Sequence, residues 1–161
     1  MYRVNKVKFF QILKLWQVGR ILYRCGKDMA AKYGLQHWNG SWAKTAVIVV
    51  LCILKNRIYL VENRDCAGVA TFQVQKKQSQ LHFAKLATDP DFAGKGVGSF
   101  CIDRIEQIAV EEACKEVFCE VYDKSEHAIA FYKKRGYVVC GKVNSIKYTQ
   151  LQMKKTVGEN E

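Results

Sequence analysis

The chain has 161 residues, of which 49% are hydrophobic, and Lys and Arg exceed Asp and Glu by 26 to 15. This length and apolar content match one compact domain with a buried core. The net charge of +11 would suit nucleic acid, an anionic membrane or an anionic cofactor. The basic residues are scattered, however, and form no dense run typical of a nucleic-acid-binding arm, so we expect no nucleic acid as a partner.

The seven cysteines are odd in number and contain no C-x-x-C pair, which argues against a disulfide framework and a zinc site. We interpret them as small core residues of a cytoplasmic protein that binds no metal. The most apolar segment, from Thr45 to Leu54, is about half the roughly 20 residues that a spanning helix needs. We therefore expect a buried helix there and no membrane partner.

In the first third of the chain, apolar residues recur at helical spacing from Lys6 to about Gly34. Gly19 and the pair Cys25–Gly26 predict a break of this region into two pieces. A second helix is predicted from Ser41 or Trp42 to Leu54, with Ser41 as its N-cap.

From Arg57 onward the sequence consists of short runs rich in β-branched and aromatic residues: "RIYLVEN", "AGVATFQVQ" and "LHFAKLAT". These runs predict three strands of an antiparallel meander. A helix follows from Val97 to about Lys115, then the strand "EVFCEVYD", then a helix over 125–135 that ends at Gly136. Two last strands, "YVVCGKV" and "SIKYTQLQMKK", precede a polar tail at 156–161. We expect a single α+β domain over residues 1–161.

Between the third strand and the long helix lies "DFAGKGVGSF", with three glycines in five residues. N–H groups at a helix N-terminus lack partners, and glycine lets phosphate oxygens come close to them. A P-loop would need Gly-Lys-Ser/Thr, but Gly98 is followed by Ser99 and Phe100. A dinucleotide fold would need a different third glycine and a second βαβ half, although Glu120 lies at about the distance of its acidic residue.

A third interpretation accounts for more of the chain. The window "AGKGVG", preceded by "LATDP" and followed about 30 residues later by "HAIAFYKKRGY", resembles the GNAT superfamily of acetyl-CoA-dependent N-acetyltransferases. The resemblance implies an α/β/α sandwich: a mixed, mostly antiparallel twisted sheet of six to seven strands flanked by about four helices. Two positions depart from the family's pattern, Ala93 in place of Arg or Gln and Ser125 in place of Asn.

The resemblance implies a direct transfer of the acetyl group from acetyl-CoA to a primary amine in a ternary complex. The third predicted strand would bind the pantetheine arm through its backbone, and a backbone amide near Leu86 would bind the oxyanion. The loop would bind the pyrophosphate, and the last predicted helix would complete the site. The implied cofactor-binding residues are Leu86, Ala87, Thr88, Ala93, Gly94, Lys95, Gly96, Val97, Gly98, Ser99, Ser125, Ala128 and Phe131.

For catalysis, the resemblance implies that Tyr132 protonates the leaving thiolate and that His82 is a candidate base, with water as the alternative. Tyr33 and Trp38 are weaker candidates for the acceptor side. Core packing could also explain His82, Tyr132, Tyr33 and Trp38. A non-catalytic module that binds acyl-CoA is the alternative function, motivated by Ala93 and Ser125, and a homodimer stays open.

Overall fold

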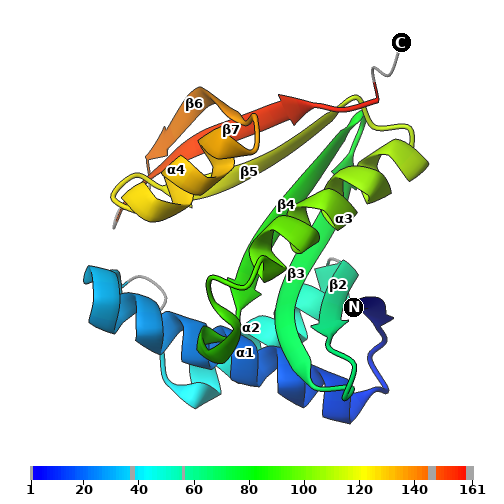
Figure 1. The fold of residues 1–161 in the computed structure, drawn as a ribbon, viewed down its shortest axis with the longest axis vertical. Helices are drawn as coiled ribbons and strands as arrows, with labels where there is room; N and C mark the ends of the chain where they lie inside the picture. Colours follow the sequence, from blue (N-terminus) through cyan, green and yellow to red (C-terminus); the bar gives the residue numbers. More distant parts are fainter. Residues whose placement is uncertain (1, 37–38, 56, 145–147, 159–161) are drawn as a thin grey trace. The chain divides into compact units, whose positions relative to one another are not determined.

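The computed structural model describes residues 2–36, 39–55, 57–144 and 148–158 (Figure 1). These ranges hold four α-helices and a mostly antiparallel sheet of seven strands in the order β1-β2-β3-β4-β5-β7-β6. The chain divides into two compact units, residues 1–74 with 85–103 and residues 75–84 with 104–161. The elements are β1 (Arg3–Val7), α1 (Ile12–Tyr33), α2 (Trp42–Lys55), β2 (Arg57–Glu62), β3 (Gly68–Lys77), β4 (Gln80–Thr88), the 3-10 turn η2 (Pro90–Phe92), α3 (Val97–Glu111), β5 (Glu116–Tyr122), α4 (Glu126–Lys134), β6 (Val138–Asn144) and β7 (Thr149–Thr156).

The first unit is built on strands β1 to β3, which pair antiparallel, with Val7 opposite Ile58 and Tyr59 opposite Phe72. Helices α1 and α2 pack against this part of the sheet (Figure 1). Their apolar side chains form a core with those of the strands. The buried residues of this core are Val7, Val18, Ile21, Val49, Ile58, Leu60 and Ala87. Strand β1 was missed by the sequence prediction, because only Val4 and Val7 of its five residues are β-branched and the other three are polar or charged.

Helix α1 is a single helix of 22 residues, so the predicted break at Gly19 and Cys25–Gly26 is wrong. Gly19 lies under the ring of Trp42, and a Cβ at Gly19 would come within 3.3 Å of that ring. The glycine therefore permits close packing of α2 on α1. The helix ends at Gly34, whose φ of 67° is the left-handed conformation typical of a C-cap.

Helix α2 begins at Trp42, and Ser41 caps it by accepting a hydrogen bond from the N–H of Lys44 at 3.3 Å. The expectation that this helix is buried is only half right. Thr45 and Val49 are buried, whereas Val47, Val50, Leu51 and Leu54 are 51–75% exposed. No helix in the described ranges is long and apolar enough to cross a membrane.

The second unit contains β5, β7 and β6, which pair antiparallel, and the first residues of β4, which pair parallel with β5 over Gln80–His82. Helix α3 ends at Glu111, earlier than predicted, and Ala113 with φ 54° turns the chain toward β5. Helix α4 ends before Gly136, as predicted, and that glycine has φ 85°. Ser125, at the N-terminus of this helix, is buried and makes no side-chain cap bond.

Candidate functional site

The glycine loop lies in the first unit, between η2 and α3, and its backbone is open. Gly94 and Gly96 have φ values of 73° and 79°, and a Cβ at either position would meet nothing within 4 Å. The first helical bond runs from the N–H of Phe100 to the carbonyl of Gly96 at 3.0 Å. Within the described ranges, no acceptor faces the N–H groups of Gly94, Gly96, Val97, Gly98 and Ser99. Unpaired N–H groups at the N-terminus of a 15-residue helix suit an anion such as a pyrophosphate.

Positive charge is present at this loop despite Ala93, which lies exposed on it. The Nζ atom of Lys95 is 5.2 Å from the centre of the Phe92 ring, which holds the ammonium close to the loop. Lys95 therefore adds positive charge beside the backbone N–H groups of the glycine loop.

The approach to the loop is fixed by Asp89, a residue that the sequence reasoning missed. Its side chain is 1% exposed, and both carboxylate oxygens accept from Nη1 of Arg24 in α1, at 2.8 and 2.9 Å. Asp89 also accepts from the N–H of Asp91 at 3.1 Å, and its own N–H donates to Val69 at 2.8 Å. This network ties helix α1, strand β3 and the start of the loop together within the first unit. The "LATDP" stretch held the only signal, since a carboxylate beside a proline is typical of a turn.

The last residues of β4 precede Asp89. The pairing of β4 with β5 covers only Gln80–His82, and Lys85 has φ 52°, which interrupts regular strand geometry. Leu86 and Thr88 are partly exposed and Ala87 is buried. These three residues therefore form the end of the strand that leads to the glycine loop.

Cys25 of α1 lies against this strand end. Burial raises the pKa of Cys25 to about 11, and a hydrogen bond with the backbone of Thr88 partly opposes the rise. Burial raises the pKa of Cys101 to about 12. Both cysteines are neutral thiols at pH 7, as expected of core residues, whereas Cys66 and Cys140 are exposed, unlike the prediction.

His82 lies in the second unit, where its Nε2 atom is 2.5 Å from a carboxylate oxygen of Glu120 on β5. The two side chains are 17% and 25% exposed. The hydrogen bond from His82 lowers the pKa of Glu120, more than burial raises it, and the charge of Lys77 adds to this effect. Glu120 is thus ionised at neutral pH and can only accept, so Nε2 of His82 carries the proton of this hydrogen bond. In the sequence, Glu120 stands out only as an acidic residue at the spacing typical of a dinucleotide-binding fold.

Tyr132 is the other predicted catalytic residue in the second unit. It lies on α4, is 9% exposed, and packs against the rings of Phe83, Phe131 and Tyr137 at centroid distances of 5.3–5.8 Å. Ser125 is buried at the start of the same helix, and Ala128 and Phe131 are partly buried along it. The structure therefore groups the predicted residues of α4.

The predicted site residues fall into two groups. Those from Leu86 to Ser99 lie in the first unit, and His82, Ser125, Ala128, Phe131 and Tyr132 lie in the second. Tyr33, a candidate for the acceptor side, is the last residue of α1 and is 53% exposed. Trp38, the other candidate, lies outside the described residues.

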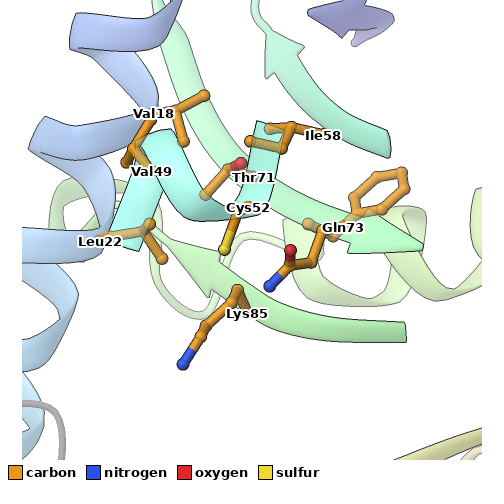
Figure 2. A pocket seen from close by; sticks show the side chains of 9 residues that line it. Val18, Leu22, Val49, Cys52, Ile58, Thr71, Gln73 and Lys85 are labelled. Atoms are coloured by element: carbon orange, nitrogen blue, oxygen red, sulfur yellow. The ribbon is translucent and has the colours of Figure 1, made fainter. Parts of the chain in front are cut away.

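A small pocket opens within the first unit between α1, α2 and the sheet (Figure 2). Its lining is apolar except for Thr71, Gln73 and Lys85, and the side chains of Gln73 and Lys85 point to the same side as Cys52. The remaining residues that line it are Val18, Leu22, Val49, Ile58 and Phe72. Lys85 is the residue with positive φ that directly precedes Leu86.

Comparisons with known proteins identify the family of the chain. The sequence matches the acetyltransferase (GNAT) family over residues 18–137. It is 22% identical over 112 residues to the uncharacterized protein YxbD of Bacillus subtilis and 23% identical over 112 residues to the uncharacterized protein YdhI of that organism, in each case covering 69% of this chain and 68% of the relative.

Solved structures share the fold. The ribosomal-protein-S18-alanine N-acetyltransferase of Escherichia coli superimposes with a TM-score of 0.75 at 14% identity, over 100% of this chain and 99% of that one. The PaiA N-acetyltransferase of Thermoplasma acidophilum, in complex with coenzyme A, superimposes with a TM-score of 0.73 at 14% identity, over 97% and 99%. The chain therefore has the fold of the GNAT acetyltransferases. The chain belongs to the GNAT acetyltransferase family.

Proposed function

We propose that this protein is an N-acetyltransferase that moves the acetyl group of acetyl-CoA to a primary amine by direct attack in a ternary complex. The observation that carries the proposal is the open glycine loop, where five N–H groups have no acceptor in the described ranges. Coenzyme A offers a pyrophosphate, the anion that such a loop suits. Lys95 adds a positive charge beside it.

The strand end before the loop would bind the pantetheine arm. Residues Leu86–Thr88 follow the last pair between β4 and β5, so an amide-containing chain could add to them as a strand does. The backbone N–H of Leu86 is then the donor nearest to the thioester and would stabilise the oxyanion. Ser125, Ala128 and Phe131 would contact the cofactor from α4.

The amine must be neutral to attack, and His82 supplies a base. Its Nε2 proton is held by Glu120, so Nδ1 can accept a proton from the amine directly or through water. The amine nitrogen forms a bond to the carbonyl carbon, and the bond from that carbon to sulfur breaks. Glu120 positions the imidazole and stabilises the charge that it gains.

Tyr132 would supply the proton that the departing thiolate needs. A phenol is ordinarily slightly less acidic than a thiol, and a phenol next to the leaving sulfur can share its proton in the transition state. The rings of Phe83, Phe131 and Tyr137 fix the direction of its side chain.

Two measurements test the proposal together: calorimetric titration with acetyl-CoA, and release of free thiol from acetyl-CoA over a panel of small amines, amino acids, aminoglycosides and peptide N-termini. We expect binding of acetyl-CoA and amine-dependent release of thiol. Binding without release on any amine would instead support a non-catalytic acyl-CoA-binding module.

A pair of glycine variants makes the binding test specific. Gly96→Ala adds a Cβ to a left-handed position in the loop and should weaken acetyl-CoA binding on the order of tenfold, since this conformation costs about 1–2 kcal/mol for an L-residue. Gly158→Ala introduces the same strain in the C-terminal tail, where φ is 87° and the space is also open, and should leave binding unchanged. If both variants changed the affinity for acetyl-CoA equally, the glycine loop would not be part of the cofactor site.

A further inference from the structure

The turn before α1 and the first residues of this helix expose large apolar side chains. Phe9, Phe10, Ile12, Leu13 and Trp16 are 76%, 62%, 74%, 79% and 55% exposed, and together they form what we call the N-terminal patch. Single exposed apolar residues are common on proteins, but five within eight residues are not. Such a concentration indicates a surface that contacts something apolar.

The patch is separate from the core of the first unit. Val18 and Ile21 of the same helix are at most 1% exposed and join the buried cluster with β1 and β2. Phe9 and Phe10 pack edge to face against each other, with ring centroids 5.4 Å apart, and both stay open to solvent. Helix α1 therefore has two apolar sides: one is buried in the core of the first unit, and the other is exposed to solvent.

The surroundings of the patch are basic. The first 27 residues contain seven Lys and Arg and no Asp or Glu. Lys6 and Lys8 are exposed, and the Nζ atom of Lys8 lies 5.8 Å from the centre of the Phe10 ring. Lys14 pairs with Glu62 at 3.3 Å, but that carboxylate is nearly buried and so adds little negative charge to the surface. The guanidinium of Arg20 lies 5.8 Å from the ring of Trp16.

We propose that the N-terminal patch binds the surface of an anionic phospholipid bilayer. Phe, Leu and Trp side chains on one side of a helix enter the boundary between headgroups and acyl chains, and lysines beside them meet the lipid phosphates. The charge on the patch is complementary to that surface. This proposal replaces the sequence expectation of no membrane partner, which considered only spanning segments.

A second copy of the chain fits the patch less well. In a two-fold dimer the same surface meets itself, which would place Lys6 and Lys8 against their own copies. The exposed area of the five side chains is roughly 600 Å², whereas a stable interface buries about 800 Å² per partner. Like charge and small area both favour the lipid surface.

Sedimentation of the full-length chain with vesicles tests the proposal. We expect it to sediment with vesicles of equal parts phosphatidylglycerol and phosphatidylcholine, to stay in solution with phosphatidylcholine alone, and to dissociate at high salt. The double variant Phe9→Ser, Leu13→Ser should lower the bound fraction on the order of tenfold or more, because two anchoring side chains are lost. Lys6→Glu, Lys8→Glu should act through charge and lower it to a similar extent.

The control is Val138→Ser, which removes a side chain that is 59% exposed on β6 of the second unit. It should bind vesicles as the unchanged chain does, and thermal melts should show that all variants fold, since every changed side chain is exposed. Failure of the unchanged chain to bind anionic vesicles at low salt would overturn the proposal. So would binding by both double variants that equals the binding of the unchanged chain. Sedimentation equilibrium showing a dimer that Phe9→Ser, Leu13→Ser converts to a monomer would assign the patch to a second copy instead.

Discussion

Tyr132 and the pair His82–Glu120 are side chains whose surroundings limit what they can do. Tyr132 is held by three aromatic rings and is nearly buried, so its hydroxyl has one direction. His82 is bonded to Glu120 through Nε2, and its other ring nitrogen, Nδ1, takes no part in that hydrogen bond. Each role depends on one polar atom and can be removed by a change that keeps the shape of the side chain.

Replacing Tyr132 by Phe should lower turnover at least about tenfold, because proton transfer by a positioned group contributes that much or more. The dissociation constant for acetyl-CoA should change by less than about twofold, since the ring and its packing remain. Steady-state thiol release and calorimetry measure the two quantities. An unchanged turnover number would remove Tyr132 from the acid role.

The lowered pKa of Glu120 also predicts how the free energy of unfolding depends on pH. Its pKa is lower in the folded chain than in the unfolded chain, chiefly through His82, so its contribution is complete above the ordinary carboxyl range of about 4.3. The contribution is lost as the pH falls through the lower folded value. Urea unfolding from neutral pH to pH about 3 should therefore show a shallower loss of stability for Glu120→Gln than for the unchanged chain.

Two other carboxylates define the control for that experiment. Glu116 also has a lowered pKa, chiefly through its hydrogen bond with Lys154, so the Glu120→Gln variant should keep part of the slope. Glu126→Gln changes an exposed carboxylate in the first turn of α4 and should keep the full slope. If the free energy of unfolding fell equally steeply with pH in the unchanged chain, Glu120→Gln and Glu126→Gln, the coupling of Glu120 to His82 would be contradicted.

Helix α1 is the element that links the N-terminal third of the chain to the glycine loop. One side of α1 packs on the sheet, and Arg24 of the same helix forms an ion pair with the buried carboxylate of Asp89. A buried charge without a partner is costly, so this ion pair fixes the turn at the start of the loop. The helix therefore helps to position the loop although it is far from it in the sequence.

Arg24→Ala should lower the free energy of unfolding by about 2–3 kcal/mol, because it leaves a nearly buried carboxylate without its main cation. Lys32→Ala removes the partner of Asp28 on the same helix, an exposed pair with an N to O distance of 2.9 Å, and should cost less than about 0.5 kcal/mol. Chemical denaturation measures both. Similar losses for the two variants would show that Asp89 does not depend on Arg24.

The charge of the entire chain bears on the choice of acceptor. With a net charge of +11, the protein repels cations at a distance, and Lys85 adds a positive charge beside the strand end that would bind the cofactor. The acceptor is therefore expected to be an amine with few additional positive charges.

Spermidine should show a lower kcat/KM than a monoamine such as ethanolamine, and added salt should narrow the difference because it screens the repulsion. Thiol release at low and high ionic strength measures this. A preference for spermidine at low salt would mean that a local acidic pocket outweighs the overall charge.

The sequence by itself determined the order of most helices and strands, the glycine loop and the helix that carries Tyr132. These features depend on periodicity, turn residues and motifs that extend over a few consecutive residues. The same local patterns wrongly predicted a helix break at Gly19, because the role of this glycine depends on the ring of Trp42. They also wrongly predicted a fully buried α2, because periodicity alone does not say which apolar side of a helix is covered.

Only the tertiary structure decided which side chains meet. Arg24 and Asp89 are 65 residues apart, and His82 and Glu120 are 38 residues apart, so no local pattern could pair them. The N-terminal patch is a similar case: its apolar residues resemble core positions in the sequence, and only the packing of α1 on the sheet shows that Phe9 and Leu13 stay outside. Burial and ion pairing are set by contacts between distant segments, and those contacts exist only once the chain has folded.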